Sequence, residues 1–127
     1  MHRLAIGMPV MLLASALALP AQTHNEVGDA GDLPLSAQVP GGTITNLTAI
    51  AGTLADGDVD MYVIDIVDPA AFTASTVGGT TLDTQLFLFF ADGRGVTHQD
   101  GFNGASGLQS AITGQFVPYP GTYLLAV

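Results

Sequence analysis

Residues 61–67 read Met-Tyr-Val-Ile-Asp-Ile-Val, and this stretch is the clearest secondary-structure signal in the chain. Tyr62, Ile64 and Ile66 occupy alternate positions, so they share one face of an extended strand. Met61 and Asp65 belong to the opposite face. Asp68-Pro69 follows and ends the run, because this dipeptide favours a turn. The stretch therefore predicts a β-strand with one apolar face.

Similar signals lie on both sides of this strand, separated by turns rich in Gly, Asp and Pro. No sustained helical period occurs from residue 40 onward. Short strands at a spacing of roughly ten residues are typical of two packed antiparallel sheets. The sequence thus predicts an all-β fold, a jelly-roll-like antiparallel β-sandwich over residues 43–127. Its last strand runs to residue 127 without a polar exit, as expected of a domain truncated at its C-terminus. The other expected strands are 43–47, 49–54, 72–77, 85–90, 96–98, 109–117 and 122–127.

The N-terminus has the pattern of a secretory leader. His2-Arg3 precedes an uncharged run at residues 4–19. Small residues stand near the end of this run at Ala18 and just after it at Ala21. We expect residues 1–21 to be a signal peptide. An uncleaved membrane anchor is the alternative, although a membrane helix needs about 20 apolar residues. The expected location is secreted, extracellular or periplasmic, with no stable membrane insertion once the leader is removed.

Charge and cysteine content exclude several classes of function. The chain has 11 acidic residues against 2 basic ones, and one of these two, Arg3, lies in the expected leader. Such a surface repels phosphate backbones, so we expect no nucleic-acid partner. Cysteine is absent, which excludes disulfides and thiolate metal sites. Residues 22–42 form an acidic lead-in that we expect to be irregular, because Gly28, Gly31 and Pro34 interrupt any helical period.

Three groups of motifs resemble the bacterial pre-peptidase C-terminal (PPC) domain, a secreted β-sandwich. The first is Asn25-Glu26-Val27-Gly28-Asp29. The second is Gly52-Thr53-Leu54 followed by Asp58-Val59-Asp60-Met61-Tyr62. The third runs from Leu82 to Phe89, then through Asp92-Gly93 to Pro120-Gly121-Thr122-Tyr123. The resemblance covers about residues 25–127. The Asp-Asp pair that often follows the hairpin in that family is represented here by Asp100 alone.

The resemblance also implies a metal site. Family members that bind collagen hold Ca²⁺ through acids that correspond to Glu26, Asp29, Asp58 and Asp60. Flexible loops with carboxylate oxygens suit Ca²⁺, which takes six to eight oxygen ligands. The alternative is that these acids only form turns and carry solvated charge. The run Asp56-x-Asp58-x-Asp60 is not an EF-hand, because Met61 stands where glycine is needed.

The sequence favours a binding role over catalysis. Ser106 lacks the spacing of a nucleophile elbow, and the histidines outside the expected leader are His24 and His98. We therefore expect a non-catalytic binding or accessory module, Ca²⁺-stabilised, whose partner is an extracellular polysaccharide or protein. Phe102, Phe116 and Tyr119 are aromatic residues in or near loops that could contact it, although core packing is the other role for each. A structural surface or matrix component without a ligand site is the main alternative, and a hydrolase is a remote one.

Overall fold

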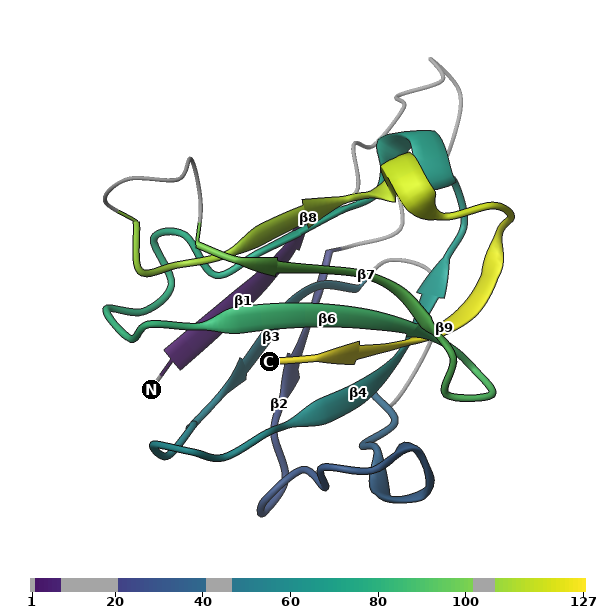
Figure 1. Ribbon diagram of the computed structural model, residues 1–127. Helices are drawn as coiled ribbons and strands as arrows, with labels where there is room; N and C mark the ends of the chain where they lie inside the picture. The colour runs from purple at the N-terminus through teal and green to yellow at the C-terminus, as the bar shows by residue number, and fades with distance from the viewer. Residues whose placement is uncertain (1, 8–20, 41–46, 102–106) are drawn as a thin grey trace.

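Two β-sheets pack face to face in the computed structural model (Figure 1). It describes residues 2–7, 21–40, 47–101 and 107–127. Sheet A has the strand order β2-β3-β1-β5-β8, and sheet B has the order β4-β9-β6-β7. The all-β prediction is confirmed. The strands are β1 (His2–Gly7), β2 (Gln22–Asn25), β3 (Leu47–Gly52), β4 (Met61–Ile66), β5 (Thr73–Ser75), β6 (Gln85–Phe90), β7 (Gly95–Asp100), β8 (Ala111–Thr113) and β9 (Gly121–Ala126).

In the described part of the chain, helical structure is limited to single turns. Across the described ranges the helices are the 3-10 segments η1 (Pro34–Ser36), η3 (Pro69–Ala71) and η4 (Gly114–Phe116). None of the helices in the described part of the chain is long and apolar enough to cross a membrane.

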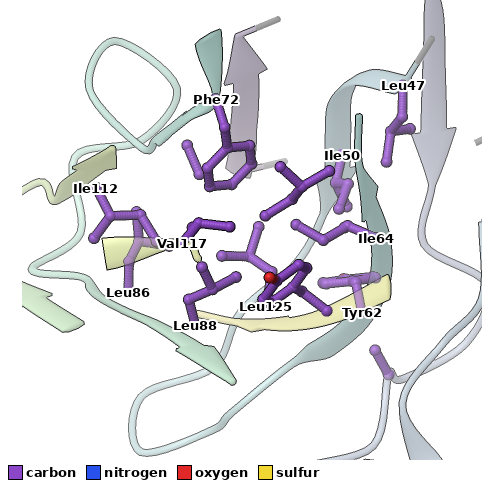
Figure 2. Close-up of a cluster of buried hydrophobic side chains, with 14 residues drawn as sticks. Leu47, Ile50, Tyr62, Ile64, Phe72, Leu86, Leu88, Ile112, Val117 and Leu125 are labelled. Atoms are coloured by element: carbon purple, nitrogen blue, oxygen red, sulfur yellow. The ribbon is translucent and has the colours of Figure 1, made fainter. Parts of the chain in front are cut away.

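An apolar core lies between the two sheets (Figure 2). Tyr62, Ile64 and Ile66 of β4 are buried in it, as their alternation predicted. Both sheets contribute side chains, so burial of this core is the main force that holds them together. The remaining members are Ala30, Leu47, Ile50, Phe72, Ala74, Leu86, Leu88, Ile112, Val117, Tyr123 and Leu125.

The lead-in covers one edge of sheet B. The Gln38 N–H donates to the Met61 carbonyl at 2.8 Å, and the Val63 N–H donates to the Gln38 carbonyl at 2.9 Å. Ala37 packs on a second apolar cluster formed by Met61, Leu124 and Ala126. An uncovered edge strand exposes unpaired backbone groups and invites aggregation. The lead-in therefore protects β4.

The lead-in is more regular than the sequence indicated. Residues 22–25 form β2, which pairs in parallel with β3, whereas the other strand pairs of the two sheets are antiparallel as predicted. Gln-Thr-His-Asn has no apolar alternation, so its pattern does not predict a strand. Pairing with the buried strand β3 overrides that weak local preference. Of the strand expected at 43–47, only Leu47 lies in the described part of the chain.

The expected leader also contributes a strand. Residues 2–7 form β1, which pairs antiparallel with β3 on one side and with β5 on the other. These residues precede the predicted sandwich, so no strand was predicted there. The signal peptide remains a prediction from sequence.

A buried hydroxyl network joins the segments around Thr76, Thr84 and Ser110. The Thr76 and Thr84 hydroxyls are 2.6 Å apart, and the Ser110 N–H donates to the Thr76 hydroxyl at 2.9 Å. The Ser110 hydroxyl donates to the Thr84 carbonyl and accepts from the Gly101 N–H at 3.1 Å. These contacts satisfy the hydrogen-bonding groups of buried side chains. They also join segments that are distant in sequence.

Candidate metal centre

The candidate site lies where β2 ends and β4 begins, so it joins the two sheets. Glu26 follows β2 directly, and its N–H donates to the Ala51 carbonyl of β3 at 2.8 Å. Asp60 precedes β4, and its N–H donates to the Val127 carbonyl at 2.9 Å. Each acid is thus held by an extension of a backbone ladder. Their positions are set by the sheets rather than by a free loop.

A tight turn brings Asp29 back toward Glu26. Glu26 Oε2 accepts from the Ala30 N–H at 3.1 Å, and Glu26 Oε1 accepts from the Thr53 N–H at 3.0 Å. Gly28 has φ 65°, a backbone conformation that residues with a Cβ adopt only with strain. Ala30 is buried in the core and anchors the end of the turn.

Glu26, Asp29 and Asp60 form an acidic triad. Each offers one carboxylate oxygen, and these oxygens lie within 4.8 Å of one another. Asp29 is exposed and Glu26 is half-buried, whereas Asp60 is only 2% exposed. Among the described residues, Asp60 Oδ1 has no hydrogen-bond partner. A buried carboxylate oxygen without a partner is costly, so this atom calls for a ligand or a proton.

The electrostatics of the triad favour a bound positive charge. Burial, and next the negative charge of Glu26, raise the pKa of Asp60 to about 7. Burial also acts to raise the pKa of Glu26, but hydrogen bonds from the Thr53 and Ala30 N–H groups outweigh it and lower the pKa. Glu26 therefore stays ionised, and one proton or one cation must offset the repulsion between it and Asp60.

Tyr62 and Gly52 complete the surroundings of Glu26. Burial and the nearby Asp60 and Glu26 charges raise the pKa of Tyr62, whose hydroxyl hydrogen-bonds to Glu26. A Cβ on Gly52 would lie 2.7 Å from Glu26 Oε1 and 2.8 Å from Glu26 Cβ. Only glycine leaves room for the carboxylate at this position. Both residues belong to motifs of the sequence, but no role at the site was predicted for either.

Asp58 is the one nominated ligand that lies outside the triad. Its Oδ1 accepts from the Val59 N–H at 3.0 Å, the local contact of a turn-forming aspartate. Its charge still contributes to the raised pKa of Asp60. The structure thus brings together Glu26, Asp29 and Asp60 of the four nominated acids. Asp58 stands close by in a turn.

Two of the three aromatic residues expected in or near loops are exposed, Phe116 by 61% and Tyr119 by 52%. Tyr119 also stacks on Phe90 at 5.9 Å between ring centroids. Phe102 lies outside the described residues.

No known protein family, curated protein or solved structure matches this chain. The three carboxylates of the site converge, with Asp29 exposed and Asp60 buried, and oxygen donors arranged in this way can bind a hard cation.

Proposed function

We propose that this protein is a secreted, non-catalytic binding or accessory module in which Ca²⁺ bound by Glu26, Asp29 and Asp60 fastens the lead-in to the sandwich. One observation carries the metal site: Asp60 is buried beside two other carboxylates, and its Oδ1 has no partner in the described part of the chain. The motifs shared with PPC domains support the same assignment and the secreted location.

Ca²⁺ fits the donor set better than other common cations. All three ligands are carboxylates, which excludes the nitrogen and sulfur donors that zinc prefers. Three side chains from a turn and a strand start give an open, irregular arrangement that Ca²⁺ accepts with water as further ligands. Mg²⁺ demands near-ideal octahedral geometry and gives up its water reluctantly. We expect Mg²⁺ to bind much more weakly.

The cation would act on the lead-in as a whole. Glu26 and Asp29 lie at the start of the segment that ends in Gln38, and Asp60 lies on the sheet side. The Met61 N–H donates to the Gly31 carbonyl at 3.0 Å, so the same segment contacts β4 directly. Neutralising the triad strengthens this attachment. The bound metal thus keeps the edge of sheet B covered.

A binding role is favoured over catalysis by the contacts of the histidines. His24 Nε2 lies 2.6 Å from Gln38 Oε1, where it helps to hold the lead-in. His98 is exposed and stacks on Phe87 at 5.7 Å between ring centroids. Both contacts are structural. The partner we propose is an extracellular polysaccharide or protein.

The metal site is tested by melting the protein in EDTA and in millimolar Ca²⁺ or Mg²⁺. We expect Ca²⁺ to raise Tm by several degrees, since a ligand at 100 times its Kd adds about 2.7 kcal/mol of stability. Glu26→Gln should abolish the shift. Asp32→Asn, an exposed acid of the same lead-in outside the triad, should keep it. An unchanged Tm in the native sequence would remove the metal from the proposal.

The partner is tested by co-sedimentation with insoluble polysaccharides and with collagen in Ca²⁺. Phe116 and Tyr119 are the exposed aromatic residues that we propose contact it, because large aromatic rings dominate recognition surfaces. The double variant with alanine at both positions should lose retention. Because Tyr119 stacks on Phe90, its loss should lower Tm slightly, whereas Phe116→Ala alone should weaken retention at a native Tm. If the native protein is retained by no polymer, the structural-component alternative replaces the binding role.

A further inference from the structure

One strand of sheet A is separated in sequence from the rest of the sandwich. β1 lies between β3 and β5 in the strand order, with both neighbours antiparallel to it (Figure 1). On one side, residues 2–5 pair with residues 49–52, and on the other, residues 5–7 pair with residues 73–75. β1 therefore bridges the two halves of sheet A, β2-β3 and β5-β8.

Without β1, the sheet would contain a strand-shaped gap. β3 and β5 would each present a row of unpaired N–H and C=O groups toward the other, and such edges readily pair with another strand. The gap would also reach the core. Ile50 and Ala74, which the register sets opposite Leu4 and Ile6, are buried members of the core cluster.

We propose that the space between β3 and β5 is a strand-acceptor groove, and that it keeps the His2–Gly7 segment bound after the chain is cut between that segment and β2. This is recognition by β-strand addition, in which backbone hydrogen bonds supply affinity and alternate positions supply specificity. The groove takes an extended segment whose backbone pairs with residues 49–52 on one side and with residues 73–75 on the other. The amino-terminal segment is also the expected leader. Cleavage after the leader would therefore leave this segment in the groove, and only its dissociation would expose the edges of β3 and β5.

The proposal does not depend on the metal site. Glu26 and Asp60 lie at the ends of β2 and β4, whereas the groove is lined by the backbones of β3 and β5. Its occupant is a named segment of this chain. A peptide of that segment is therefore a direct probe.

The test uses the full chain with a protease recognition sequence inserted between residues 8 and 20. After cleavage, native gel filtration with mass spectrometry shows whether the amino-terminal peptide stays with the remainder. We expect it to stay, and we expect a labelled synthetic peptide of residues 2–7 to exchange with it. The matched control carries Ala5→Pro, since Ala5 pairs with both Ala49 and Ser75. Proline cannot donate to a ladder, so this peptide should bind roughly tenfold more weakly or worse.

Each outcome decides the proposal. Retention and exchange that proline blocks support it, as does faster hydrogen exchange in β3 and β5 when the peptide is competed away. Release of the peptide with an unchanged Tm of the remainder overturns it. If the remainder unfolds on release, recovery of its melting transition when the native-sequence peptide is added back supports the groove. If neither the native-sequence peptide nor the Ala5→Pro peptide restores the melting transition, the groove proposal is overturned.

Discussion

At the scale of single residues, the site depends on a glycine as much as on its acids. Gly52 faces the side chain of Glu26 so closely that any Cβ would overlap it. Glu26 also holds the turn through Ala30 and the loop through Thr53. Displacing the carboxylate therefore disturbs the turn, the loop and the cation site together.

Gly52→Ala should lower stability and remove the Ca²⁺ response in one step. The added methyl forces Glu26 aside, and overpacking of this kind costs about 1–3 kcal/mol. Thermal melting in EDTA and in Ca²⁺ measures both effects. Gly95→Ala is the matched control, because a Cβ there meets open space and its φ is ordinary. A Gly52→Ala protein with native Tm and a native Ca²⁺ shift would contradict the packing argument.

The sequence could nominate the acids of the site but not their arrangement. Glu26, Asp29 and Asp60 were identified through motifs whose order resembles a known family. Their convergence depends on a parallel β2–β3 pair that no apolar alternation signals. Asp58 and Asp60 stand two residues apart in the same acidic run. Asp58 nevertheless lies in a turn, where its carboxylate accepts a hydrogen bond from the Val59 N–H. Spacing alone cannot distinguish a turn former from a ligand before the strand start is known.

At the scale of elements, apolar patterns predicted the strands that line the core. The alternating run at 61–67 corresponds to β4, and the nearly all-apolar run at 85–90 corresponds to β6. In β6 Leu86 and Leu88 are buried, whereas Phe87 and Phe89 are half-buried. β8 is shorter than the strand expected at 109–117, because η4 begins at Gly114. A Cβ on Gly114 would overlap the Pro69 carbonyl, so η3 and η4 approach more closely than other residues would permit. Such close approach depends on tertiary packing, which the period of a sequence does not encode.

The hydroxyl network yields a prediction about how elements are joined. Ser110 is fully buried, and Ser110→Ala would leave the Gly101 N–H and the Thr84 carbonyl without this partner. Lost hydrogen bonds to buried groups cost about 1–3 kcal/mol. Urea unfolding should show that loss with little change in the m-value. Ser75→Ala, which removes a hydroxyl that accepts from the Val77 N–H in a more exposed place, should cost clearly less. Equal costs would show that burial of the network contributes nothing.

At the scale of the whole molecule, stability must contend with a net charge of −9 at pH 7. Self-repulsion of this size destabilises a compact state, and salt screens it. Arg94 already forms an ion pair with Asp92 at 2.8 Å, and its guanidinium lies 4.8 Å from the Phe90 ring centroid. Little positive charge remains to offset the acids. The triad is the place where that repulsion is concentrated in a buried position.

The pH dependence of stability in EDTA should therefore be unusual for an acidic protein. The pKa of Asp60 is raised from 3.8 to about 7 by folding, so between these values the unfolded state loses a proton that the folded state keeps. Stability falls as pH rises from about 4 to about 7, by an amount on the order of a few kcal/mol at about 1.4 kcal/mol per pKa unit. The lowered pKa of Glu26 acts in the opposite direction, but only near and below its ordinary value of 4.5.

Melting temperatures from pH 4 to pH 8 would reveal this decline, and Asp60→Asn should flatten it. The amide cannot ionise, so the variant should be more stable than the native protein at pH 7.5 in EDTA and less stable than it in Ca²⁺. Ca²⁺ should flatten the native profile as well, because the cation replaces the proton in offsetting the charge of Glu26. A native profile in EDTA that rises steadily toward pH 7 would mean that Asp60 ionises as readily when folded as when unfolded. Its burial beside Glu26 would then exert no measurable strain, and the strongest reason for a cation at the triad would be lost.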